Sequence, residues 1–115
     1  MFNTYEDGLV AERKFNQVKA GLDGLTAKYN ETGGFSFTLN PSNPLPSNND
    51  HKKGIVYKGK IGTLMFFNIE LRLYNGYTNE QKSLGEKCLY ISINGLHPFS
   101  FYPQAIRNLI ETFVD

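Results

Sequence analysis

Several features are scarce in this chain of 115 residues, and each scarcity excludes a class of protein. Cys88 is the single cysteine, so no internal disulfide can form and nothing indicates an oxidising compartment. With only His51 and His97 beside it, the chain lacks the ligands of a four-ligand zinc site. We therefore expect neither a metal nor a cofactor.

Long apolar runs are also missing. The longest mostly apolar stretch, Ile61 to Phe67, is far shorter than the roughly 20 residues that span a bilayer. The first residues show no basic region followed by an apolar one, as a secretory signal would. These patterns predict a cytoplasmic protein without membrane contact.

Neither sign of charge is in excess over the whole chain. Twelve Lys and Arg face eleven Asp and Glu, a net charge of +1, which excludes an acidic nucleic-acid mimic and a histone-like polycation. The balance is uneven along the chain: residues 1–50 carry −2, residues 51–87 carry +4 and residues 88–115 carry −1. The basic middle is therefore the segment of most interest for binding.

Motifs for catalysis are absent. The chain has no Gly-rich phosphate loop, no dinucleotide-binding fingerprint and no nucleophile elbow. Cys88 and His97 could be paired as nucleophile and base, but free cysteines are usually small buried hydrophobic residues and no orienting third group is indicated. Glu70 and Arg72 share one strand face and are more simply explained as a cross-strand ion pair. We expect a protein that is not an enzyme.

The first segment, from Thr4 to about Asn30, is predicted to be a helix. Apolar residues recur every three or four positions and form one stripe: Ala11, Phe15, Val18, Leu22, Leu25 and Tyr29. Thr4 and Asp7 suit the start of such a helix as cap and first-turn acid. Gly21 and Gly24 each cost about 1 kcal/mol relative to alanine. They indicate either the close approach of another backbone or a kink or break near residue 21.

Two segments of opposite character follow this helix. Phe35 to Leu39 alternates with a period of two residues and is predicted to be a strand. Residues 40–54, rich in Pro, Asn and Ser, are predicted to be a long polar loop. Too few residues precede this loop for it to divide domains, so residues 1–115 are expected to form a single domain.

The main β region comes next. Gly59 and Gly62 indicate a turn or bulge that separates two strands, Ile55–Lys58 and Thr63–Tyr74. In the second strand, alternate residues are predicted to face the core: Met65, Phe67, Ile69, Leu71 and Leu73. Asn75–Gly76 then predicts a tight turn.

The rest of the chain completes the sheet and adds a helix. Tyr77–Glu86 is expected to be a loop or a short return strand, and Lys87–Ile93 a further strand. A second turn at Asn94–Gly95 makes Leu96–Tyr102 a candidate last strand, whose register stays open. After Pro103, an apolar stripe predicts a C-terminal helix: Ile106, Leu109, Ile110, Phe113 and Val114.

Together these elements predict the α+β class: an N-terminal helix, an antiparallel sheet of four or five strands, and a C-terminal helix. No alternation of strand and helix exists, which argues against a parallel nucleotide-binding sheet. The two helical stripes most simply cover one sheet face together. The other face is then either open or buried in a partner.

The candidate binding residues combine charge with aromatic rings on the predicted outward positions: Lys58, Lys60, Arg72, Tyr74, Tyr77 and Tyr90. Lysines neutralise phosphates and tyrosines stack on unpaired bases, as in single-strand binders. Tyrosine-rich patches are equally typical of protein interfaces. A third explanation involves no ligand: lysines on edge strands prevent the sheets of two molecules from associating.

The leading hypothesis is a non-enzymatic binding protein that occupies a surface of a partner protein. An adaptor, an inhibitor or an immunity-type factor would fit, and the sequence does not separate a cellular origin from a virus- or mobile-element-encoded one. The alternative is a single-stranded nucleic-acid-binding module that uses the basic and aromatic sheet face. A homodimer through the same face or through the first helix lies between these hypotheses.

Overall fold

The computed structural model describes residues 2–32, 37–45, 51–61, 65–76, 78–95 and 103–113. The elements in chain order are β1 (Phe2–Asp7), α1 (Gly8–Thr32), β2 (Phe37–Leu45), β3 (His51–Ile61), β4 (Met65–Asn75), α2 (Asn79–Ser83), β5 (Glu86–Asn94) and α3 (Gln104–Phe113). No helix in these ranges is both long and apolar enough to cross a membrane.

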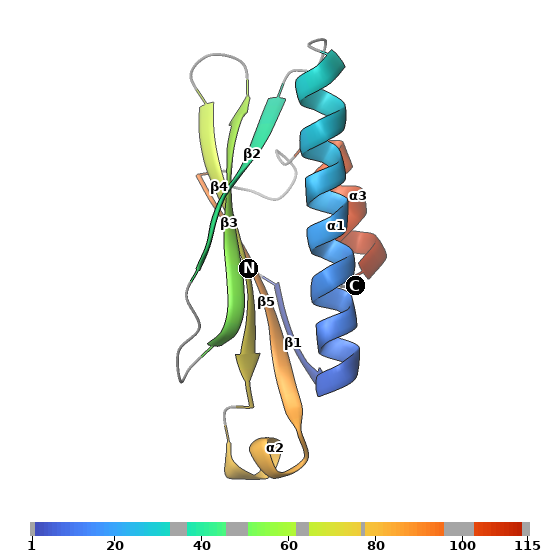
Figure 1. Ribbon diagram of the computed structural model, residues 1–115, viewed down its shortest axis with the longest axis vertical. Helices are drawn as coiled ribbons and strands as arrows, with labels where there is room; N and C mark the ends of the chain where they lie inside the picture. Colours follow the sequence, from blue (N-terminus) through green and yellow to red (C-terminus); the bar gives the residue numbers. More distant parts are fainter. Residues whose placement is uncertain are drawn as a thin grey trace.

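The five strands form one sheet in the order β1-β5-β4-β3-β2, and every neighbouring pair is antiparallel. Both long helices, α1 and α3, lie on the same side of this sheet (Figure 1). The α+β class, the antiparallel sheet and the helices covering one face together are therefore confirmed. Below, the inward face is the sheet face that packs on α1 and α3, and the outward face is the opposite one.

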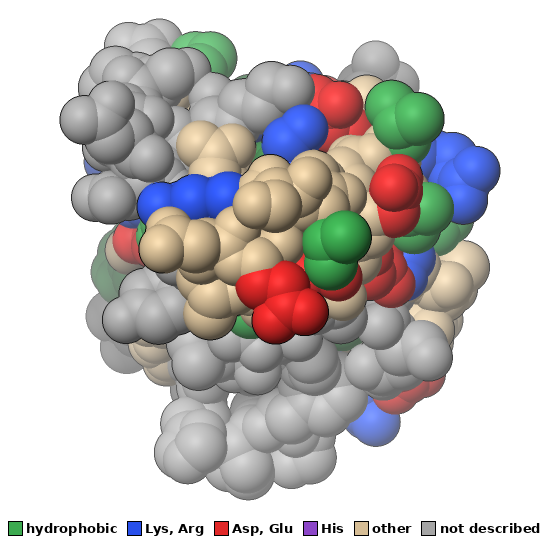
Figure 2. Space-filling model, turned by 90° about the horizontal axis from the view of Figure 1, so that it is seen from below, with side chains coloured by type: hydrophobic (Ala, Val, Ile, Leu, Met, Phe, Trp, Pro, Cys, Tyr) green, Lys and Arg blue, Asp and Glu red, His purple; other side chains and the backbone are tan. Residues whose placement is uncertain are grey.

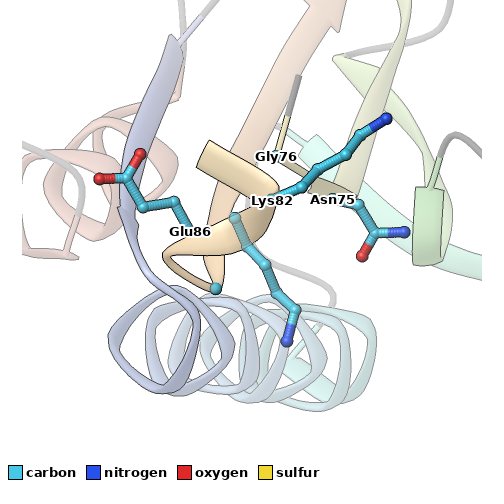
Figure 3. A pocket seen from close by; sticks show the side chains of 6 residues that line it. Asn75, Gly76, Lys82 and Glu86 are labelled. Atoms are coloured by element: carbon cyan, nitrogen blue, oxygen red, sulfur yellow. The ribbon is translucent and has the colours of Figure 1, made fainter. Parts of the chain in front are cut away.

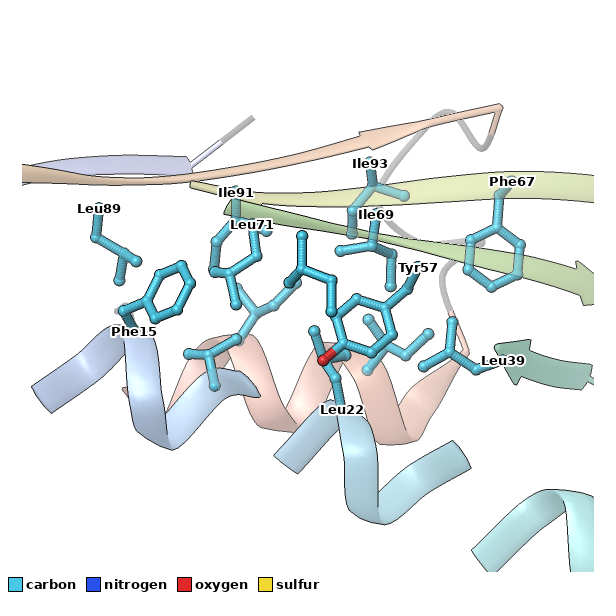
Figure 4. Packing of buried hydrophobic residues seen from close by; sticks show 14 of the residues in the cluster. Phe15, Leu22, Leu39, Tyr57, Phe67, Ile69, Leu71, Leu89, Ile91 and Ile93 are labelled. Atoms are coloured by element: carbon cyan, nitrogen blue, oxygen red, sulfur yellow. The ribbon is translucent and has the colours of Figure 1, made fainter. Parts of the chain in front are cut away.

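The hydrophobic core lies between the inward face and the two helices. The predicted alternation in β4 is confirmed, because Phe67, Ile69, Leu71 and Leu73 are buried there. The helical stripe of α1 meets them with Ala11, Phe15, Val18 and Leu22, and α3 adds Ile106 and Ile110. Figure 4 shows the strand side chains pointing from the sheet toward α1 and α3. Burial of this continuous apolar surface is the main driving force for the fold.

The chain begins with a strand, where the sequence predicted a helix from Thr4. Residues Phe2–Asp7 pair with β5, which satisfies their backbone hydrogen-bonding groups in the sheet. The helix starts at Gly8, and its cap is Asp7, whose Oδ1 accepts a hydrogen bond from the backbone N–H of Leu9 at 2.9 Å. The Thr4 cap was therefore wrong, whereas the core stripe from Ala11 to Leu25 was placed correctly, and the side chain of Tyr29 lies outside the described part of the structure.

The polar segment 40–54 is not one long loop. β2 continues to Leu45 and β3 already starts at His51, so much of the segment pairs as antiparallel strands. The register shifts between Pro41 and Pro44, which is where the two prolines interrupt regular pairing. Residues 46–50 lie outside the described ranges.

Gly59 lies within β3 and does not divide the β region. A Cβ atom built at this position would come within 2.1–2.5 Å of ring atoms of Phe67 on β4. Glycine is therefore required here because the buried Phe67 ring occupies the space that a side chain would take. β3 ends at Ile61 and β4 begins at Met65. The sequence therefore predicted two strands correctly but placed the boundary between them too early in the chain.

The connection from β4 to β5 contains a short helix that sequence analysis missed. A capping box stabilises the N-terminus of α2. The Thr78 side chain accepts a hydrogen bond from the backbone N–H of Gln81, and the Gln81 side chain accepts one from the backbone N–H of Thr78. Asn75 and Lys87 still pair across the connection. The predicted last strand Leu96–Tyr102 lies outside the described residues.

Candidate functional site

The outward face gathers most of the candidate binding residues. Lys58 and Lys60 are two residues apart on β3, and Arg72 and Tyr74 are two residues apart on β4, so each pair lies on one face of the sheet. Tyr90 lies on the same face of β5. All are at least partly exposed, and on β3 and β4 buried residues alternate with them. Tyr77 is the one predicted residue that falls outside the part of the chain that the structure describes.

One end of the outward face is basic and aromatic. Lys58 is exposed, and the Lys60 ammonium lies 5.6 Å from the centre of the Phe66 ring, a cation–π arrangement. Phe66 pairs in register with Lys60 and keeps 66% of its surface exposed. The exposed ring therefore offers apolar contact area directly beside positive charge. Phe66 was not among the candidate binding residues that the sequence indicated.

A row of exposed amide side chains crosses the sheet next to this basic end. Asn40, Lys58, Asn68 and Asn94 pair in register across β2, β3, β4 and β5, and all four are exposed. Amide groups both donate and accept hydrogen bonds. The alternation of the strands could have indicated the β4 member of this row, but the cross-strand register was needed to align the others.

The middle of the outward face carries an ion pair. Arg72 Nε lies 3.4 Å from Glu70 Oε2. The pair was expected, but it runs along one strand, between residues i and i+2 of β4, and not across strands. The positive charge of Arg72 is thus largely balanced within the face, and the uncompensated charge of the face lies at Lys58 and Lys60.

Beyond the ion pair, two tyrosines pack against each other. The rings of Tyr74 and Tyr90 have centroids 5.7 Å apart and an interplanar angle of 89°, an edge-to-face contact. Cys88 pairs in register with Tyr74 and is buried, its thiol pointing to the carbonyl oxygen of Leu89 at 3.6 Å. A buried thiol of this kind behaves as a small apolar group. His97, its suggested partner, lies outside the described residues.

A network of polar side chains between the sheet and α1 stabilises the fold. Tyr57 is fully buried, and its hydroxyl donates to Asp23 Oδ1 at 2.6 Å. Burial and the neighbouring Asp23 carboxylate raise the pKa of Tyr57 above its ordinary value. Burial alone would raise the pKa of Asp23, but hydrogen bonds from Lys19 and Tyr57 outweigh this effect and the pKa lies below its usual range. This network ties β3 to α1.

A hollow of about 350 Å³ lies at the α2 end, between Asn75, Gly76, Lys82, Gly85, Glu86 and Lys87. Its polar groups do not converge, because Glu86 and Asn75 project to opposite sides of α2 (Figure 3). Viewed from this end, hydrophobic side chains form separate patches among charged ones (Figure 2). The described residues around this hollow form neither a reaction centre nor an apolar docking patch.

No group of His, Cys, Asp and Glu suited to a metal ion occurs among the described residues. The chain matches no protein-family model, no curated protein and no solved structure.

Proposed function

We propose that the protein is a non-enzymatic binding protein whose outward face is a protein–protein interface. It would act as an adaptor, an inhibitor or an immunity-type factor by occupying a surface of its partner. The observation that carries the proposal is the exposed Phe66 ring on the same face as the Tyr74–Tyr90 pair and three cationic side chains. Aromatic residues and arginine are enriched in such interfaces.

The arrangement of the rings supports binding with little loss of side-chain freedom. Tyr74 and Tyr90 hold each other edge to face, and each is only partly exposed. A ring whose position is already fixed loses less entropy when a partner covers it. Arg72, held by Glu70, is likewise ordered before contact.

The test compares three folded baits in a quantitative pull-down from isotope-labelled lysate of the source cells. The baits are the wild-type protein, Phe66→Ala and Leu84→Ala. Leu84 is the matched control because it is 63% exposed, close to the 66% of Phe66, but lies beside α2 and away from the outward face. We expect one partner to be at least about tenfold depleted with Phe66→Ala alone, since losing an interface hot spot costs about 2 kcal/mol or more.

Two results would contradict the proposal. One is that the folded wild-type bait recovers no stable partner. The other is that all three baits recover the same partner equally, which would place the interface elsewhere.

A second candidate function is the binding of single-stranded nucleic acid. It is favoured by Lys58 and Lys60, which lie next to the exposed Phe66 ring and could contact phosphates while the ring stacks on a base. Fluorescence anisotropy with a labelled oligothymidylate at low salt tests it. Binding that weakens steeply as salt rises is expected, and no binding at low salt would exclude it.

A further inference from the structure

Five cations of the described sheet and helices form no ion pair there, and two of them, Lys58 and Lys60, lie together on the outward face; the others are Arg13, Lys53 and Lys82. Lys14 pairs with Glu6, Lys19 with Asp23, Arg72 with Glu70, Lys87 with Glu12 and Arg107 with Glu111. Within the described part of the chain, Lys58 and Lys60 form no ion pair. Two adjacent cations left without compensation on one face create a local positive potential that attracts an anionic group.

The two lysines have a defined spacing. They are residues i and i+2 of β3 on the same face, so their Cα atoms lie about 6.6–6.8 Å apart along the strand. Acidic residues at alternate positions of an extended peptide have the same spacing. Asn40 and Asn68 flank Lys58 in register, and their amides can hydrogen-bond to a peptide backbone.

We propose that the basic end of the outward face binds an extended acidic segment of the partner protein. Carboxylates at alternate positions of that segment pair with Lys58 and Lys60, and an apolar side chain between or beside them covers Phe66. This inference rests on the proposed function and names the chemistry of the partner at that same face.

The rest of the face favours a peptide over a nucleic acid. Glu70 neutralises Arg72, and alternation along β5 puts Glu86 on the same face as Tyr90, so a long phosphate backbone would meet acids beyond the two lysines. The two tyrosine rings also contact each other edge to face, which limits their stacking on bases. A single-strand binder needs a longer basic track with free ring faces.

The experiment selects ligands from a phage-displayed library of random dodecapeptides on the immobilised full chain. Enriched peptides are then synthesised, and their affinities are measured for wild type, for Lys58→Glu/Lys60→Glu and for Arg13→Glu/Lys82→Glu. The last variant changes the net charge equally but alters exposed residues of α1 and α2. Circular dichroism checks that both variants fold. A labelled oligothymidylate of fifteen nucleotides is titrated in parallel.

We expect enriched peptides with acidic residues at alternate positions next to an apolar one. Their affinity should fall at least tenfold with Lys58→Glu/Lys60→Glu and less than threefold with Arg13→Glu/Lys82→Glu, and it should weaken as salt rises. Peptides without acidic enrichment, no enrichment, or equal losses in both variants would overturn the inference. Tighter binding of the oligothymidylate, lost in the β3 variant, would overturn it in favour of nucleic acid. In each case the Phe66→Ala pull-down still decides separately whether the face is a protein interface.

Discussion

At the scale of single residues, Tyr57 shows how a polar group is held inside the core. Its ring packs with the buried apolar residues (Figure 4). Its hydroxyl donates a hydrogen bond to Asp23 on α1 at 2.6 Å, and the Lys19 ammonium contacts the other oxygen of that carboxylate at 2.8 Å. A buried hydroxyl without a partner would destabilise the fold, so Asp23 is what makes a tyrosine acceptable at this position.

The first prediction concerns Tyr57→Phe and pH. At pH 7 we expect a loss of about 1–2 kcal/mol in unfolding free energy, because the hydrogen bond to a charged carboxylate disappears. Since the pKa of Tyr57 is raised in the fold, its contribution is complete below about pH 10 and is lost as pH rises further, by about 1.4 kcal/mol per pH unit. Urea unfolding at pH 7 and pH 11 should therefore show the difference between variant and wild type shrinking at pH 11.

The matched control is Tyr5→Phe, at an exposed site on β1. Its effect on stability at pH 7 should stay within about 0.5 kcal/mol. If Tyr57→Phe costs the same at both pH values, the hydroxyl is not protected from ionisation by the fold, and the account of its raised pKa is wrong.

At the scale of elements, the two glycines of α1 have different roles. A Cβ atom at Gly21 would lie 2.4 Å from Leu109 Cδ1, so this glycine lets α3 pack closely on α1. A Cβ atom built at Gly24 would meet no neighbouring heavy atom within 4 Å. The helix is continuous through both residues. The expected close approach at residue 21 thus involves a side chain of α3, and the suggested break does not occur.

The second prediction follows from this contrast. Gly24→Ala should stabilise the protein by about 0.5–1 kcal/mol, because alanine is the better helix former and meets no obstacle. Gly21→Ala should destabilise it by about 1 kcal/mol or more, since the gain is outweighed by displacing Leu109. Thermal and urea unfolding of both variants measures the two effects.

A double variant separates packing from helix propensity. In a Leu109→Ala background the obstacle is gone, so Gly21→Ala should become stabilising, much like Gly24→Ala. Equal stabilisation by both glycine substitutions in the wild-type background would rule out the proposed contact between the two helices.

The sequence predicted the elements whose patterns arise from burial alone. The apolar stripe of α1 and the alternation in β4 report which face meets the core, and both were right. The strand β1 could not be predicted in this way, because its pairing with β5 depends on residues 79 to 89 positions away. α2 was missed because its five residues bury no side chain and so leave no periodic signal, although Thr78 and Gln81 have the spacing of a capping box.

The same reasoning explains which parts of the candidate site could be predicted. The outward direction of Arg72 and Tyr74 follows from alternation within β4. Which cations are paired with an acid does not follow from alternation, because only the structure shows that Glu70 contacts Arg72 while Lys58 and Lys60 form no ion pair with the described residues. The amide row of Asn40, Asn68 and Asn94 likewise needs the register of four strands.

At the scale of the whole molecule, α1, α3 and the sheet contribute to one core. The third prediction is therefore a single cooperative unfolding transition with a heat-capacity change of about 1.4–1.7 kcal/mol/K for 115 residues. Helical circular dichroism reports on α1 and α3. Because the chain has no tryptophan, intrinsic fluorescence reports on its seven tyrosines. The two signals should have the same midpoint, and separate midpoints would show that the helices unfold independently of the sheet.

The irregular pairing of β2 has a consequence for how copies of this protein meet one another. In the described sheet β2 is an outermost strand, and Pro41 and Pro44 remove two of its backbone N–H groups at the point where the register shifts. A strand from another molecule would find an incomplete and bent template there, which disfavours sheet growth into fibrils from this side. This edge therefore adds little to any tendency of the exposed Phe66 ring to promote aggregation at high concentration.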